Sequence, residues 1–112
     1  MEENWMLHRL RSAFLRANIL LIVLRLLSGE ELTEWEILSL LHSRYGVTAS
    51  AKEFRRLYNL MVGGGYARVE YVGTTRKLHI TESGADLLHR LEEEYRDIVS
   101  GFGVSSSVVL TR

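Results

Sequence analysis

The apolar positions of the N-terminal segment repeat with a helical period. From Trp5 to Leu27 the spacing predicts one helix, whose second half is apolar almost all the way round. Only Arg11, Asn18 and Arg25 mark a narrow polar stripe along it. Helices on the outside of a monomer normally carry a broad polar back. We therefore expect this helix either between the core and a partner subunit, or at the centre of a core without a partner.

Two shorter helices follow, joined by a tight turn. Thr33 and Ser50 each stand three residues before a glutamate, which is the spacing of a capping box, where the two side chains satisfy free N–H groups of a first helical turn. Gly46 is placed to end the first of these helices, and the glycines at 63–65 are placed to end the second, expected at residues 51–62. This arrangement predicts a helix-turn-helix.

After the glycines the period changes from helical to alternating. Val69 and Tyr71, then Leu78 and Ile80, are apolar positions in two short runs on either side of a turn that contains glycine and threonine. Such a pattern predicts a β-hairpin, here over residues 66–81.

A last helix is expected over residues 82–102, with Thr81 as its cap. One side of this helix is apolar, and the pattern offers no later element to cover it. Residues 103–112, rich in glycine and serine, are expected to form a flexible tail. The apolar side comprises Leu87, Leu88, Leu91, Tyr95, Ile98 and Val99.

Composition places the chain among ordinary globular proteins, because 46% of the residues are hydrophobic and 25% are charged. The absence of cysteine excludes a disulfide scaffold and a thiolate zinc site. The longest apolar run, residues 17–27, is too short to span a bilayer, and the N-terminus is acidic where a secretory signal would be basic. We therefore expect a cytoplasmic protein without a membrane partner.

The net charge of zero is a sum of segregated blocks. Residues 51–79 carry six basic and two acidic side chains, whereas residues 80–97 carry six acidic and two basic ones. The distribution of charge matters more than its total for binding a polyanion, so the first block predicts a basic face. The alternative is that both blocks are ordinary solvated helix faces.

The helix expected at residues 51–62 has the chemistry of a recognition helix. On a helical projection its polar side chains share the face opposite its apolar ones. A guanidinium can donate twice to guanine, an amide can pair twice with adenine, and lysine can bind a phosphate. The polar face consists of Lys52, Arg55, Arg56 and Asn59, of which Asn59 and then Arg55 are the best candidates for base reading.

The expected hairpin tip is also basic and rich in hydroxyls. Thr74, Thr75, Arg76 and Lys77 would reach a neighbouring groove or its phosphates from there. If Val69 points inward, Arg68 points to the outer surface, where it is a further phosphate contact.

These segments resemble the PadR-like transcriptional regulators, in their short form. Residues 19–41 resemble that family's first helix, turn and second helix, with Trp35-Glu36-Ile37 in place of its aromatic-Glu-Ile triplet. Residues 76–84, RKLHITESG, resemble its wing strand and the start of its C-terminal helix. The resemblance implies a homodimeric transcriptional repressor that binds a pseudo-palindromic operator, with helix 51–62 in the major groove and hairpin 66–81 as the wing.

The fold class expected is α+β, mainly α, a winged helix-turn-helix with N-terminal and C-terminal dimerisation helices. Residues 1–81 would form the DNA-binding domain with an N-terminal helical extension, residues 82–102 the C-terminal dimerisation helix, and residues 103–112 the tail. The expected partners are double-stranded DNA and a second copy of the chain. The expected dimer interface comprises Leu20, Val23, Leu24, Leu87, Leu91, Tyr95 and Ile98.

Other functions find less support in the sequence. No nucleophile elbow, P-loop or zinc-protease motif occurs, so a binding protein is favoured over an enzyme, and no cofactor or metal is expected. Asp86, His89 and Glu93 share a helix side that could hold a metal, and Trp5 and Trp35 could stack on a flat effector, but a solvated face and packing are the favoured explanations. The main alternative is a winged-helix module that binds an acidic protein partner without DNA.

Overall fold

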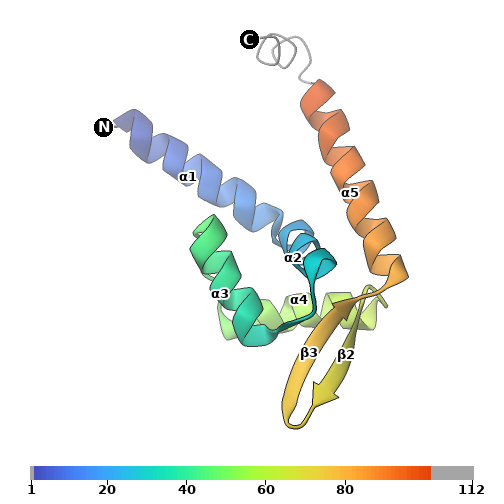
Figure 1. Cartoon of the computed structure of the whole chain (residues 1–112). Coiled ribbons are helices and arrows are strands. Elements are labelled where there is room, and N and C mark those ends of the chain that lie inside the picture. Colours follow the sequence, from blue (N-terminus) through green and yellow to red (C-terminus); the bar gives the residue numbers. More distant parts are fainter. Residues whose placement is uncertain (1, 102–112) are drawn as a thin grey trace.

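The computed structural model describes the backbone of residues 2–101 and the side chains of residues 4–97. Five helices and three short strands make up this part of the chain, so the expected α+β, mainly helical class is confirmed. Figure 1 shows the helices and the hairpin of β2 and β3. The tail expected at residues 103–112 lies outside the described residues. The elements are α1 (Glu2–Ala17), α2 (Ile19–Gly29), β1 (Leu32–Thr33), α3 (Glu34–Tyr45), α4 (Ala51–Gly63), β2 (Ala67–Val72), β3 (Thr75–Ile80) and α5 (Glu82–Gly101).

The long N-terminal helix expected from Trp5 is in fact two helices that meet at Asn18, which corrects the sequence prediction. Asn18 leaves helical geometry at φ −111° and ψ 25°, and its side-chain Nδ2 donates to the carbonyl of Phe14 at 2.8 Å. An asparagine side chain that bonds the local backbone competes with the helix, so it closes α1. The backbone carbonyl of Asn18 then accepts from the N–H of Ile22 at 3.1 Å, which starts α2.

Both helix starts of the helix-turn-helix are built as the sequence predicts. Thr33 and Ser50 each accept a hydrogen bond at 3.1 Å from the N–H of the glutamate three residues later, which accepts one at 2.9 Å in return. Gly46, at φ +67°, ends α3 in the left-handed conformation that glycine adopts without strain. The capping boxes therefore set where α3 and α4 begin, and so the length of the turn between them.

The three strands form one antiparallel sheet with β3 in the middle, between β1 and β2. The expected hairpin is confirmed, but its turn has only two residues, Gly73 and Thr74. Thr75 and Arg76, which the sequence pattern places in the turn, are instead the first residues of β3. The sequence does not predict β1, because two residues are too few to show an alternating period.

A single apolar core lies between α2, α3, α4 and the sheet. The first half of α5 joins this core through Leu88, and α5 packs against α2 and β3. Beyond this contact, α1 and α5 leave the body as two diverging arms (Figure 1). The largest fully buried side chains are Leu24, Ile37, Leu41, Met61 and Val23.

Gly84, in the first turn of α5, lies against Tyr66, in the segment between α4 and β2. Its N–H donates to the Thr81 hydroxyl at 3.0 Å, and the same hydroxyl donates to the carbonyl of Gly65 at 2.6 Å. A methyl group at Gly84 would overlap the backbone carbonyl of Tyr66 and lie 2.8 Å from Cγ1 of Ile80. Since a backbone carbonyl cannot rotate away, we expect Gly84→Ala to lower the free energy of unfolding by about 1–3 kcal/mol.

Gly63→Ala is the matched control, because a methyl group there meets no atom within 4 Å. Alanine is the better helix former, so this variant should be as stable as the parent or up to about 1 kcal/mol more stable. Urea unfolding of both variants checks the prediction. Equal stabilities would show that α5 can shift away from Tyr66 at little cost.

Candidate nucleic-acid interface

The polar face predicted for the second helix of the helix-turn-helix is present on α4. Lys52, Arg55, Arg56 and Asn59 are all exposed, and the opposite side of the helix is buried. The structure also exposes Leu60, which follows Asn59 and falls outside the apolar arc of the helical projection. That position is the signal by which Leu60 could have been added to the face from sequence.

A cavity of about 300 Å³ lies between α4, the start of α3 and β3. It brings Arg55 and Asn59, the two candidates for base reading, together with Arg76 of the hairpin. Glu34, in the first turn of α3, is the acidic side chain of its wall. Three of the predicted binding residues therefore converge on one hollow, although they come from two separate elements.

The sequence predicted that Arg76 projects from the hairpin tip. In the structure its side chain instead folds back onto α4. Its guanidinium lies over the ring of Tyr58, 5.0 Å from the centroid, and Nη1 donates to the Tyr58 hydroxyl at 3.4 Å. Nη2 lies 3.6 Å from Oε1 of Glu34. Exposed ion pairs and cation–π contacts are each worth only about 0–1 kcal/mol, so these contacts orient Arg76 without trapping it.

The remaining predicted residues on the strands of the hairpin share one face of the sheet. Because strand side chains alternate, Arg68, Thr75 and Lys77 lie on the face opposite that of the buried Leu78. Arg68 is exposed, as expected from the inward position of its neighbour Val69. Lys77 is partly buried in the middle of the sheet, opposite Glu70 and Thr33, so its predicted place at the tip is wrong.

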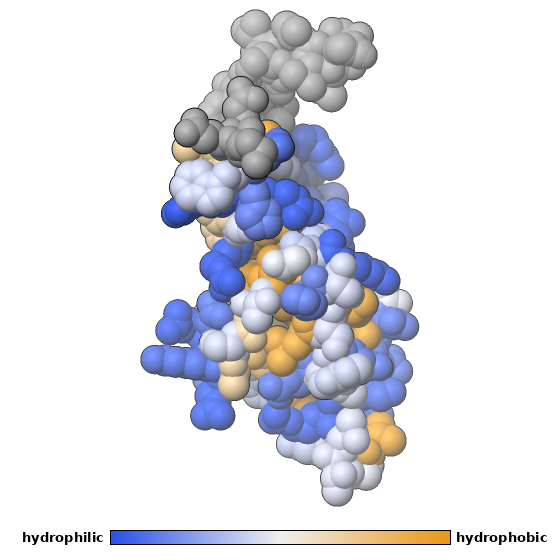
Figure 2. Space-filling view, turned by 90° about the vertical axis from the view of Figure 1, so that its left-hand side faces the viewer, coloured by the Kyte–Doolittle hydropathy of each residue, from blue (hydrophilic) through white to orange (hydrophobic). Residues whose placement is uncertain are grey.

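Two large side chains occupy the end of the hairpin that the sequence assigned to polar residues. Tyr71 is 65% and Val72 57% exposed. Tyr71 shares a strand face with Val69, but it lies beyond the edge of the core, so the alternating period placed it inward wrongly. In Figure 2, apolar atoms are visible at the lower end of the molecule, where the hairpin lies in Figure 1.

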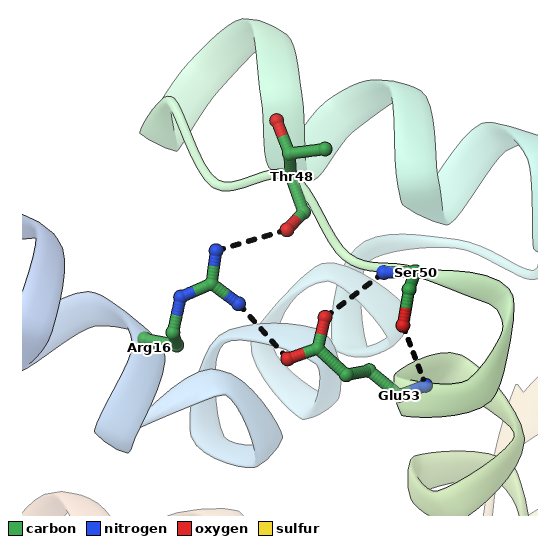
Figure 3. A network of polar contacts seen from close by, with 4 residues as sticks. All are labelled: Arg16, Thr48, Ser50 and Glu53. Carbon is green, nitrogen blue, oxygen red and sulfur yellow. Dashed lines mark hydrogen bonds and ion pairs between the residues drawn. The ribbon is translucent and has the colours of Figure 1, made fainter.

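Glu53, on the edge of the polar face, belongs to the cap of α4. Its Oε1 accepts from the N–H of Ser50, and its Oε2 lies 2.9 Å from Nη1 of Arg16 (Figure 3). The hydrogen bond from Ser50 and the nearby Arg16 charge lower the pKa of Glu53 below its ordinary value of 4.5. The charged carboxylate therefore stabilises the folded chain at neutral pH, and this stabilisation is lost as the pH falls through the lowered pKa.

The predicted dimer interface needs correction in α2. Val23 and Leu24 have 0% exposed surface and fill the core of the protomer, so a partner subunit cannot contact their side chains. Sequence alone could not tell an apolar side that faces the chain's own core from one that faces a second copy. Leu20, Leu87 and Leu91 are partly buried against the same core.

The exposed apolar surface lies instead on α1 and on the outer part of α5. Tyr95 is 40% exposed, and its ring lies 5.5 Å from that of Phe14 of α1. The side chain of Ile98 lies outside the described residues. The helical spacing of the α1 residues was available as a signal and was missed: Met6, Leu7, Leu10 and Phe14 are all exposed on one side of the helix.

The weaker candidate sites remain dispersed. Among the described side chains no group of three forms a metal site, although His89 Nε2 lies 3.3 Å from Glu93 Oε2. Trp5 and Trp35 are both exposed but lie on different helices. None of the described helices is long and apolar enough to cross a membrane.

No protein-family model and no curated protein sequence matches this chain. Among the solved structures similar to it are a transcriptional regulator and a DNA-binding protein. A transcriptional regulator from Clostridium thermocellum has a TM-score of 0.71 at 17% sequence identity, over 82% of this chain and 99% of the regulator. The winged-helix DNA-binding protein F93 from STIV has a TM-score of 0.65 at 22% identity, over 75% of this chain and 92% of F93. The likeness confirms the winged-helix fold, and membership of the PadR-like family stays a prediction.

Proposed function

We propose that this winged-helix chain is a DNA-binding transcriptional regulator that places α4 in the major groove and the β2–β3 hairpin against the neighbouring backbone. One observation carries the proposal: Lys52, Arg55, Arg56 and Asn59 share the exposed face of the second helix of a helix-turn-helix. The two similar structures support it, because one is named a transcriptional regulator and the other a winged-helix DNA-binding protein.

Within this face we assign base reading to Asn59 and Arg55 and phosphate binding to Lys52 and Arg56. Asn59 and Arg55 line the hollow beside Arg76, where a base edge can reach both an amide and a guanidinium. Phosphate can compete for Arg76, because exposed contacts such as those with Glu34 and Tyr58 are weak. The hairpin adds contacts to the DNA sugar–phosphate backbone, which carry no sequence information. We assign these contacts to Thr74, Thr75, Arg68 and Lys77, the last two on the outer face of the hairpin.

We further propose that the regulator is a homodimeric repressor of a pseudo-palindromic operator. The apolar stripe of α1 meets α5 at the Phe14–Tyr95 contact, and the two arms then diverge (Figure 1), so most of the exposed stripe is left without a neighbour from α5. We propose that a second copy contacts this stripe together with Tyr95 and the partly exposed Leu20, Leu87 and Leu91. A twofold dimer would present two copies of α4 to half-sites about 10–10.5 base pairs apart.

Binding to genomic DNA fragments, including the region upstream of the chain's own gene, tests the proposal. We expect specific fragments to bind with a Kd in the range of about 10⁻⁸–10⁻¹¹ M at physiological salt, and random duplexes far more weakly. If a folded dimer binds no fragment more tightly than about 10 μM, the chain is instead the protein-interaction module.

The salt dependence of the same binding identifies the phosphate contacts. The logarithm of the binding constant should fall with the logarithm of salt concentration by about 0.9 per neutralised phosphate, so Lys52→Ala should lower the slope by about 1. Arg90→Ala removes the same charge from α5 and should leave the slope unchanged. Equal slopes for the parent and Lys52→Ala would remove Lys52 from the interface.

A further inference from the structure

The arm α1 is attached to the body of the molecule by few contacts. Its chain connection is the joint at Asn18, where helical geometry is interrupted. On one side Phe14 packs on Tyr95 of α5, with ring centroids 5.5 Å apart. On the other side Arg16, in the last turn of α1, contacts the helix-turn-helix. One non-helical residue leaves two free backbone dihedrals at the joint, so the direction of the arm also depends on its side contacts, which include Leu15 against the core.

Arg16 makes two hydrogen bonds that end on two different parts of the helix-turn-helix (Figure 3). Nη1 donates to Oε2 of Glu53, in the first turn of α4, at 2.9 Å, and Nη2 donates to the carbonyl of Thr48, in the turn, at 3.0 Å. A planar guanidinium that donates in two fixed directions sets an orientation, which a lysine ammonium would not do.

Glu53 is itself held in place. Its Oε1 accepts from the N–H of Ser50, while the Ser50 hydroxyl accepts from the N–H of Glu53. The carboxylate that caps α4 is therefore the same one that receives Arg16. In this way the start of the recognition helix and the end of the arm share one carboxylate.

Small rotations of α1 have large consequences at its far end. The helix has 16 residues, which at 1.5 Å per residue is about 24 Å. A rotation of about 10° at the joint therefore moves the far end by about 4 Å, similar to the 3.4 Å spacing of base pairs along a strand. If α1 carries the dimer interface, its angle to α4 sets the separation of the two recognition helices.

We propose that Arg16 is a positioning residue that fixes the angle between α1 and α4, and so sets the half-site spacing that the dimer accepts. This inference rests on the proposed function. Arg16 and Glu53 are 49% and 40% exposed, and exposed pairs contribute little to stability. The contact therefore acts on geometry rather than on folding, and this separates a positioning role from a structural one.

The test uses the full chain and duplexes in which two fixed half-sites are separated by spacers of varied length. The parent should prefer one spacer. Arg16→Ala and Glu53→Gln should each reduce its preference over the next length by about fivefold, with the affinity for a single half-site within about twofold of the parent. Glutamine at 53 retains an oxygen for the cap, so this variant removes the ion pair while keeping α4 capped.

Arg16→Lys should also widen the range of spacer lengths that the dimer binds, because one ammonium cannot replace both directed hydrogen bonds. Arg11→Ala, which removes the same charge from an exposed position of α1, should leave the spacing unchanged. An unchanged preference in both Arg16→Ala and Glu53→Gln overturns the inference and leaves the proposed function standing. Absence of duplex binding by the parent rejects the proposed function, and the half-site role of Arg16 with it.

A second measurement reports the angle itself without DNA. The chain has no cysteine, so spin labels can be placed by His8→Cys on α1 and Arg44→Cys on α3, both exposed positions. Labelled chain diluted with unlabelled chain reports the distance within one protomer. The distribution of label-to-label distances should be broader in Arg16→Ala than in the parent, and as narrow as the parent in Arg11→Ala. Equal widths for Arg16→Ala and the parent overturn the positioning role.

Discussion

Replacing both Arg55 and Asn59 by alanine is expected to remove most of the discrimination between an operator and a random duplex. Each bidentate contact to a base edge is worth about 1–3 kcal/mol of discrimination, so the pair accounts for about 2–6 kcal/mol. The full preference of specific over non-specific binding is about 4–10 kcal/mol. The measurement is the ratio of the two dissociation constants at one salt concentration.

The matched variants for this prediction are Lys52→Ala and Arg56→Ala. They lie on the same face of α4, and Arg56→Ala removes the same side chain as Arg55→Ala, but we assign Lys52 and Arg56 to phosphate. They should weaken binding to the operator and to a random duplex by the same factor, and so leave the ratio of the two dissociation constants unchanged. A ratio lowered equally by all of these substitutions would mean that the base-reading part of α4 is misplaced.

Leu10→Glu, in the middle of the apolar stripe of α1, is expected to convert the proposed dimer to a monomer. Leu10 is 60% exposed in the protomer, so the substitution costs the fold little, whereas a carboxylate buried between two subunits without a partner is costly. A monomer engages one half-site, so operator affinity should fall by about 10²–10⁴-fold with the loss of two-site binding. Light scattering and operator titration measure the two effects.

His8→Glu is the control, since His8 lies on the side of α1 opposite the stripe and is also exposed. This variant should remain dimeric and bind the operator as the parent does. A stable dimer of Leu10→Glu with unchanged affinity would exclude α1 from the interface. The same result would also contradict the positioning role of Arg16, which requires α1 to carry the dimer interface.

Dimerisation shows how the structure redirects a sequence prediction. From sequence, Leu91 on the apolar side of α5 is assigned to the dimer interface. In the structure Leu91 packs partly against the core, so its replacement would disturb the protomer as well. The exposed stripe on α1 offers a cleaner test, because its side chains stand away from that core.

The sequence by itself determined the features that depend on neighbouring residues. Both capping boxes, the glycine that ends α3, the polar face of α4 and the hairpin follow from local hydrogen bonding and from periods of apolar positions. These features place Lys52, Arg55, Arg56 and Asn59 together, because residues of one helix keep a fixed angular relation wherever the helix lies. The proposed base-reading face is therefore largely a property of the sequence.

Only the tertiary structure decided features that join distant parts of the chain. The burial of Val23 and Leu24, the position of Arg76 over Tyr58 and the Arg16–Glu53 bridge all depend on which elements pack together. An apolar side chain fits a core and an interface equally well, and an arginine can pair with any nearby carboxylate or ring. The periodicity of one segment carries no information about its neighbours in space, so these choices are made only when the helices and the sheet come together.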